Sequence, residues 1–159
     1  IKKELLINFL KKFKGLKYRQ QIIYKNNNMT IINDSKSTSF ASSLGALKMN
    51  TNIYWLLGGI YKKGDKFNLL KKYRKNINAF IFGKNKKFFI KQLKGKIKYR
   101  LFKNLNNAVK KVFAISKKQN FKHKVILFSP SAASFDSFEN FEQRGSYFNK
   151  LVKKYINVQ

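Results

Sequence analysis

Three polar segments of this sequence combine residue types that bind or transfer charged groups. The first, NDSKST at residues 33–38, places Lys36 beside the hydroxyls of Ser37 and Thr38, just before an expected helix. Backbone N–H groups at a helix start attract anions, so this segment can form a cradle for an oxyanion or a phosphate. It lacks the glycines of a P-loop. The alternative is structural, with a serine or threonine acting only as the N-cap of the helix.

The second segment, GGIYKKGDKF at residues 58–67, begins with two glycines that follow an apolar run. Adjacent glycines let the backbone approach a ligand closely, and Lys62 and Lys63 supply positive charge. An ordinary turn also explains the glycine pair, and the sequence leaves both explanations open.

The third segment, SPSAASFDSFENFEQRG at residues 129–145, is the most distinctive. Ser134 and neighbouring backbone N–H groups can hold a carboxylate, and small residues keep the loop after Pro130 tight. Asp136 and Glu139 have the spacing of a capping box. The aromatic residues of this segment can form the wall of a pocket, although side chains at this spacing also suit a core; they are Phe135, Phe138 and Phe141.

The chain has only six acidic residues, and all but Glu4 lie in or beside these three segments. Acids retained against so basic a background are expected to have a role there. The chain has no cysteine, so disulfides and thiolate metal sites are excluded. The single histidine, His123, comes just before an expected strand, so no Ser/His/Asp triad is available and His123 is expected to be structural or solvated.

The elements that must position these segments alternate between strands and helices. Apolar runs at 52–59, 77–83, 97–102 and 124–130 predict strands, and amphipathic stretches at 39–49, 67–75, 86–94, 105–118 and 138–156 predict helices. A further helix is expected at 3–14, and an antiparallel β-hairpin at 20–33 near the N-terminus. The pattern predicts an α/β, three-layer Rossmann-like domain with a mostly parallel sheet. Ligands bind such sheets at the carboxyl ends of the strands, so Thr38, Lys62 and Ser134 are expected to converge on one cleft.

The composition fits one folded domain with a strong positive charge. The chain has 159 residues, 43% of them hydrophobic, and a formal net charge of +30. Such a charge is typical of nucleic-acid or anionic-membrane binding. Only four of the 36 basic residues are arginines, however, and arginine is the preferred residue for phosphate and base contacts. A solvated basic surface is therefore favoured over specific nucleic-acid binding, and a basic nucleic-acid-binding α/β module is the alternative. No apolar run is long enough to insert into a membrane.

Taken together, the three segments resemble the Mur ligase family, and within it the D-glutamate-adding ligases. The resemblance rests on NDSKST, on LLGG followed by Lys62 and GDKF, and on SPSAASFDSFENFEQRG. A fourth match is FKGLKYR at 13–19, where the family has F-x-G-L-x-H-R. The similarity runs from about residue 9 to the C-terminus, and the DNPR signature of the diaminopimelate-adding members is absent.

The resemblance implies an ATP-dependent ligase of peptidoglycan synthesis in the bacterial cytoplasm. In that reaction ATP phosphorylates the carboxylate of UDP-N-acetylmuramoyl-L-alanine. The amine of D-glutamate then attacks the acyl phosphate, which gives an amide, ADP and phosphate. The cofactors implied are ATP and Mg²⁺, with the metal ligands outside this chain.

The family also implies roles for individual residues. Thr38 and Lys62 are expected to hold one carboxylate of D-glutamate. Ser134, with the backbone near Phe135 and Phe141, is expected to hold the other. The residues expected to face the nucleotide and the reacting phosphate are Arg19, Asp34 and Lys36. Lys36 is expected to be the catalytic residue among them. Asn140 and Arg144 match further family positions and are expected to support the loop.

The implied domain organisation has residues 1–15 as a linker helix from a preceding ATPase domain and 16–159 as the C-terminal amino-acid-binding domain. Because the chain starts at Ile1 and lacks the P-loop, it is expected to be a fragment that is inactive alone. Its expected partners are the upstream ATPase and UDP-binding domains. Two departures from the family stand out: Tyr18 replaces the usual histidine, and Ile60 stands where some members have an acid. The stretch around Lys62 is one residue longer than in some members, so Lys63 can also fill its role.

Overall fold

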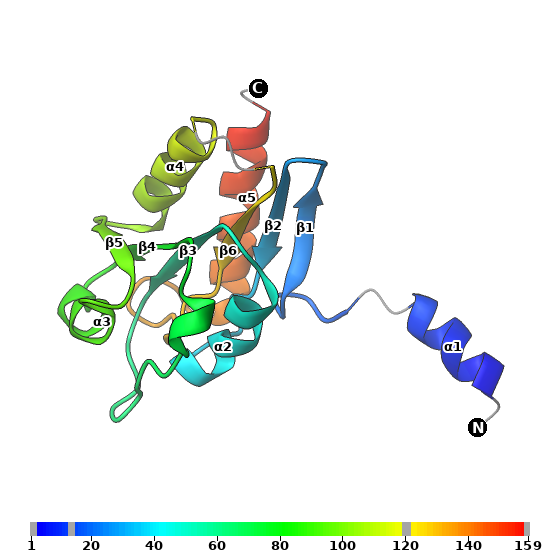
Figure 1. Cartoon of the computed structure of the whole chain (residues 1–159), viewed down its shortest axis with the longest axis horizontal. Coiled ribbons are helices and arrows are strands. Elements are labelled where there is room, and N and C mark those ends of the chain that lie inside the picture. The colour runs from blue at the N-terminus through cyan, green and yellow to red at the C-terminus, as the bar shows by residue number, and fades with distance from the viewer. Residues whose placement is uncertain (1–2, 13–14, 119–121, 158–159) are drawn as a thin grey trace.

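The fold is built on one six-stranded sheet, seen in a computed structural model that describes residues 3–12, 15–118 and 122–157 (Figure 1). Its strands lie in the order β1-β2-β6-β3-β4-β5. Their bounds are β1 Gln21–Lys25, β2 Met29–Asn33, β3 Ile53–Gly58, β4 Ile77–Phe82, β5 Lys98–Leu101 and β6 Lys124–Phe128.

All neighbouring strands are parallel except β1, which pairs antiparallel with β2. The β1–β2 pair is the hairpin expected at 20–33, with a register shift between Ile22 and Tyr24. The last strand, β6, lies between β2 and β3, so the sheet joins segments from both ends of the chain. The α/β fold class and the mostly parallel sheet are confirmed.

Helices cover both faces of the sheet and complete three layers (Figure 1). Helices α2 and α3 pack on one face, and α4 and α5 pack on the other. The helix bounds are α1 Lys3–Lys12, α2 Phe40–Met49, α3 Lys86–Leu93, α4 Leu105–Ser116 and α5 Phe141–Ile156, with a 3₁₀ turn η1 at Lys71–Tyr73.

Strand β3 shows why the central strands are apolar at every position. Its side chains alternate between the two faces of the sheet. Trp55 and Leu57 enter the core under α2 and α3, whereas Tyr54 and Leu56 enter the core under α4 and α5. Because both faces are covered, all six β3 residues are buried.

Two helix predictions need correction. The stretch 67–75 forms only the short turn η1, because Phe67 and Leu69 are buried at alternate positions and the Phe67 N–H donates to Gln92 Oε1 at 3.1 Å. A helix cannot bury residues two apart on one face. Helix α5 begins at Phe141 and not at 138, because the Asn140 side chain caps it by accepting from the Gln143 N–H at 2.7 Å.

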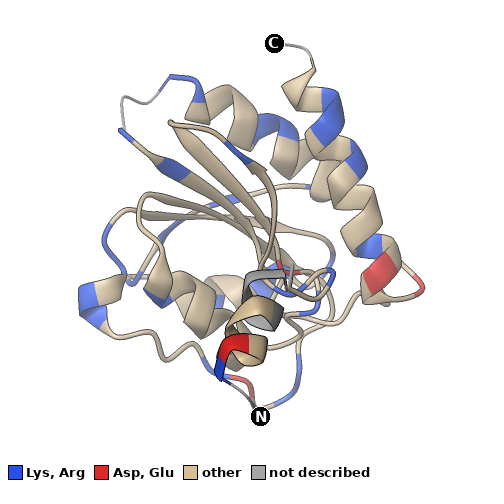
Figure 2. Cartoon of the chain, turned by 90° about the vertical axis from the view of Figure 1, so that its right-hand side faces the viewer, with Lys and Arg blue, Asp and Glu red and all other residues tan. Residues whose placement is uncertain are grey.

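Helix α1 lies apart from the sheet in Figure 1, and its apolar side chains Leu5, Leu6 and Ile7 are exposed. Within the described residues no helix combines the length and apolarity that crossing a bilayer requires. Lysines and arginines are spread over helices and loops, whereas acidic residues occupy only a few places (Figure 2).

Candidate functional site

The three polar segments follow three strands that are neighbours in the sheet. Residues 33–38 follow β2, 129–145 follow β6 and 58–67 follow β3, and β6 lies between the other two strands. Because these strands are parallel, their carboxyl ends meet at one edge. By contrast, His123 lies at the amino end of β6, where Nε2 is 3.0 Å from Thr30 Oγ1. The expectation that the three polar segments lie at one edge of the sheet is therefore confirmed.

The segments after β3 and β6 are joined by backbone hydrogen bonds. Ile60 and Ala133 form an antiparallel bridge in which each N–H donates to the other carbonyl at 2.9 Å. The Gly58 N–H also donates to the Pro130 carbonyl at 3.0 Å. This bridge fixes the start of the loop that carries Lys62 beside the loop that carries Ser134.

A buried network of hydroxyl groups joins the segments after β2 and β6 to helix α2. Ser43 Oγ, on α2, lies 2.6 Å from both Ser37 Oγ and Ser131 Oγ. Ser129 Oγ lies 2.8 Å from Ser43 Oγ and donates to Asp34 Oδ2 at 2.7 Å. Since all these side chains are buried, they satisfy one another's polar groups without water. The network therefore fixes the loop positions and does not present free hydroxyls to a ligand.

Arg144 is the buried cation at the centre of this edge, with 1% of its surface exposed. Its Nε donates to Ser35 Oγ at 3.1 Å and its Nη2 donates to the Ser35 carbonyl at 2.8 Å, while Nη1 has no hydrogen-bond partner. Burial lowers the pKa of the guanidinium to about 10, and the nearby charge of Asp136 opposes that shift. Arg144 thus fastens the 33–38 segment to α5.

The helix starts near the site are capped by side chains. Ser39 caps α2 in a capping box with Ser42, and Asp65 Oδ2 accepts the Phe40 N–H at 2.7 Å. These N–H groups are therefore occupied, which favours the capped-helix alternative over a cradle of free backbone N–H groups.

The prediction that Asp136 and Glu139 form a capping box is wrong. Asn140 caps α5 instead. Asp136 turns toward the end of β4, where a Cβ added at Gly83 would lie 2.9 Å from its Oδ2. Burial raises the pKa of Asp136 above its usual value, and hydrogen bonds from its own N–H and that of Lys84, with the charges of Arg144 and Lys84, oppose the rise.

The residues expected to face a nucleotide lie together. A cavity of about 330 Å³ is lined by six residues: Arg19, Gln20, Asp34, Lys36, Ser37 and Ser42. Arg19 reaches it because its neighbours are held in place: the Lys36 N–H donates to the Tyr18 carbonyl at 3.0 Å, and the Gln20 N–H to Asp34 Oδ1 at 3.1 Å. Two cations in one small cavity suit a phosphate or carboxylate group.

Lys36 also contacts the start of α5. Its Nζ lies 3.6 Å from the centre of the Phe141 ring, a cation–π contact. Phe141 in turn meets the ring of Tyr18 edge-on at 6.5 Å. The ring of Phe141 therefore contacts Lys36, whereas only a backbone role was expected for this residue.

The residues expected to hold D-glutamate are at the same edge but differ in exposure. Thr38 and Lys62 are exposed, Ser134 is buried, and Phe135 is 70% exposed. The lining of the 330 Å³ cavity does not include Thr38, Lys62 or Ser134. The structure thus brings these residues to one edge through linked loops, and whether they form a single cleft stays a prediction.

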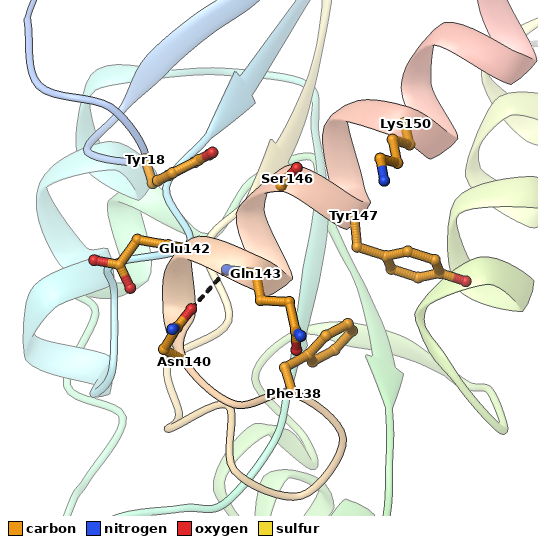
Figure 3. Close-up of a pocket in the computed structure, with 8 residues that line it drawn as sticks. All are labelled: Tyr18, Phe138, Asn140, Glu142, Gln143, Ser146, Tyr147 and Lys150. Atoms are coloured by element: carbon orange, nitrogen blue, oxygen red, sulfur yellow. Dashed lines mark hydrogen bonds between the residues drawn. The ribbon is translucent and has the colours of Figure 1, made fainter.

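A larger groove, about 630 Å³, runs along the exposed side of α5 (Figure 3). It takes in Asn140 at the cap of the helix and Tyr18 from the N-terminal segment, whose ring covers Gly145. A Cβ at Gly145 would lie 2.3 Å from that ring, so Tyr18 packs against α5. Of the expected site residues, Asn140 lines this groove, whereas Lys36, Lys62 and Ser134 do not.

Sequence reasoning did not identify Ser35, Ser43 and Asp65 as residues that organise the site. Their contacts join positions distant in the sequence, such as Arg144 with Ser35 and Asp65 with Phe40. The signals in the sequence were the rarity of acids and the NDSKST and GDKF matches, which contain Ser35 and Asp65 without giving their contacts.

Asp34 is expected to give the folding stability a defined pH dependence. Burial raises the pKa of its carboxyl above the usual 3.8, against hydrogen bonds from Ser129 and Gln20 and the charge of Arg19, which lower it. Its contribution to stability is therefore fully present below the unfolded pKa and is lost as pH rises through the raised folded pKa. The free energy of unfolding of Asp34→Asn, relative to that of the wild type, should therefore increase as pH rises from about 3 to about 7. Urea unfolding of both proteins across this range measures the difference, and a pH-independent difference contradicts the expectation.

No protein-family model matches the chain. The chain is similar to part of a curated protein, the UDP-N-acetylmuramoylalanine–D-glutamate ligase. It is 39% identical over 150 residues to the ligase of Francisella tularensis subsp. tularensis and 38% identical over 150 residues to that of subsp. novicida. Each match covers 92% of this chain but 35% of the relative. The chain therefore spans about a third of the length of the ligases that it matches.

Proposed function

We propose that this chain is the C-terminal, amino-acid-binding domain of a ligase that adds D-glutamate to UDP-N-acetylmuramoyl-L-alanine in the bacterial cytoplasm. The observation that carries the proposal is the match to one part of the Francisella ligases over 92% of the chain. In this proposal residues 1–15 connect to a preceding ATPase domain and 16–159 form the amino-acid-binding domain. The chain contributes to the reaction only as part of the complete enzyme.

The D-glutamate site is proposed to use the two linked loops at the sheet edge. Lys62 supplies an ammonium and Thr38 a hydroxyl, both exposed, to one carboxylate of the amino acid. Ser134 and the backbone N–H groups near Phe135 and Phe141 take the other carboxylate. A charged donor to a carboxylate forms a stronger hydrogen bond than a neutral one, so Lys62 should contribute most to the affinity.

The reacting phosphate is proposed to lie at the cavity lined by Arg19 and Lys36. Their positive charges stabilise the negative charge that spreads over phosphate oxygens during transfer. The carboxylate of Asp34 already accepts from Gln20 and Ser129, so we assign it to orienting this cavity. ATP and Mg²⁺ supply the phosphoryl chemistry when bound. By the family resemblance, the metal ligands are proposed to lie outside this chain.

Lys62→Ala in the complete ligase is expected to raise the KM for D-glutamate more than the KM for ATP. Loss of a charge-assisted hydrogen bond costs about 1.5–3 kcal/mol, which corresponds to a factor of about ten to a hundred or more. Steady-state kinetics with each substrate varied in turn measures the effect.

The matched control for that experiment is Lys63→Ala, which removes the same charge one residue further along the same exposed loop. It should leave the KM for D-glutamate nearly unchanged. If Lys63→Ala is the impaired variant, the role belongs to Lys63. If neither variant raises this KM, the assignment of the loop to D-glutamate is wrong.

A further inference from the structure

We propose that Asp65 is a positioning residue that holds the Lys62 loop against the start of α2, so that Lys62 and Thr38 reach the same carboxylate. This inference rests on the proposed function, because it concerns the same amino-acid site. Asp65 itself is not proposed to touch the substrate. Its role is to fix the distance between two binding groups that come from different strands of the sheet.

Asp65 makes one contact on each side of this junction. Its Oδ2 accepts the Phe40 N–H at 2.7 Å, and Phe40 is the first residue of α2, two positions after Thr38. Its own N–H donates to the Lys62 carbonyl at 3.1 Å, which closes a tight turn that includes Gly64 at φ +81°. Asp65 thus connects the backbone of Lys62 to the helix start beside Thr38 through two hydrogen bonds.

The middle of the loop needs such a connection because its lysines are exposed and are not held by burial. These lysines are Lys62, Lys63 and Lys66. The two ends of the loop are fixed elsewhere: Ile60 pairs with Ala133 and the Phe67 N–H donates to Gln92. A freely moving lysine side chain loses rotational entropy on binding and gains little net free energy from one contact. Holding the loop backbone in place before the ligand arrives avoids the further cost of ordering the loop.

The electrostatics at this junction support the assignment. Asp65 is half-buried, and its carboxylate lies at the N-terminus of a ten-residue helix, where negative charge is favourable. The acid is surrounded in sequence by three lysines but is directed at a helix N–H. A capping role alone would stabilise α2 without affecting substrate binding, so the experiment must separate these two effects.

The test compares Asp65→Ala and Asp65→Asn in the complete ligase, with Lys66→Ala as the matched control in the same loop. Asp65→Ala is expected to raise the KM for D-glutamate about tenfold, because it removes a hydrogen bond to a charged acceptor. The kcat and the KM for ATP should change by less than about twofold. Asparagine keeps an oxygen that can accept the Phe40 N–H, so Asp65→Asn should raise the KM only about threefold. Lys66→Ala should behave as wild type.

Each outcome decides the question. An unchanged KM for D-glutamate in Asp65→Ala, with Lys62→Ala still impaired, overturns the positioning role and leaves the proposed function standing. An unchanged KM for D-glutamate in both Asp65→Ala and Lys62→Ala overturns the site assignment itself. If Asp65→Ala lowers kcat/KM equally for D-glutamate and ATP and also lowers the Tm, Asp65 is only a helix cap. If Asp65→Ala does not fold, the test rests on the roughly threefold increase in the KM for D-glutamate expected for Asp65→Asn. An unchanged KM for D-glutamate in Asp65→Asn then overturns the proposal.

Discussion

Gly59→Ala is expected to unfold much of the population of this domain or to separate the two loops at the candidate site. Gly59 has a φ of +130°, which side-chain-bearing residues rarely adopt, and a Cβ at this position would lie 2.2 Å from the Ala133 carbonyl oxygen. That oxygen accepts the Ile60 N–H, so the clash acts directly on the Ile60–Ala133 bridge. Backbone strain and overpacking together should cost roughly 2–6 kcal/mol.

The matched control for this substitution is Gly45→Ala. Gly45 lies within α2, and an added Cβ would meet only Gln20 Nε2, at 3.6 Å. Alanine in a helix interior is favoured over glycine by about 0.5–1 kcal/mol, so this variant should be as stable as wild type or more stable. Urea unfolding followed by circular dichroism measures both variants. A cost below about 1 kcal/mol for Gly59→Ala would show that the bridge can shift freely.

Trp55→Ala is expected to have the second large effect. The indole is fully buried in the core beneath α2 and α3, where it packs against Phe40 and Phe67. Its Nε1–H donates to the Ser129 carbonyl at 2.8 Å, at the start of the loop that carries Ser134. Truncation leaves a large cavity and should cost about 3–5 kcal/mol.

A second variant separates the hydrogen bond from the cavity. Trp55→Phe keeps most of the apolar volume but removes the donor, which leaves the buried Ser129 carbonyl with only the longer hydrogen bond from Ser131 Oγ at 3.4 Å, at a cost of about 0.5–1.5 kcal/mol. Circular dichroism is the suitable probe for unfolding, because this is the only tryptophan in the chain. Equal destabilisation by the two variants would contradict the cavity argument and assign the whole effect to the Ser129 contact.

The sequence predicted the layers of this fold and the common edge of the three polar segments, for a physical reason. Strands buried on both faces are apolar throughout, as β3 is, and amphipathic helices between them require a parallel sheet. Once the sheet is parallel, the segments after Asn33, Gly58 and Phe128 must lie at one edge. The roles proposed for Thr38, Lys62 and Ser134 came from the family resemblance and stay predictions.

The remaining contacts could not be derived from local patterns. The stretch 67–75 has helical spacing, yet Phe67 and Leu69 are both buried in the core under α2 and α3 and lie outside any helix. Asp136 has the spacing of a helix cap, but Asn140 lies closer to the helix and caps it. Asp65 caps a helix that begins 25 positions earlier in the chain. Such contacts depend on tertiary packing, which overrides local propensity.

The central position of β6 affects the order in which this chain can fold as it leaves the ribosome. A chain synthesised only as far as residue 118 contains the β1–β2 hairpin and the β3–β4–β5 sheet, but it lacks the strand that joins them. The facing edges of β2 and β3 are then open, and open edges of apolar strands pair readily with other chains. Long-range pairing of this kind is slow, since distant segments must meet before the contacts form. We therefore expect nascent chains to be prone to aggregation until residues 124–128, which form β6, emerge and insert.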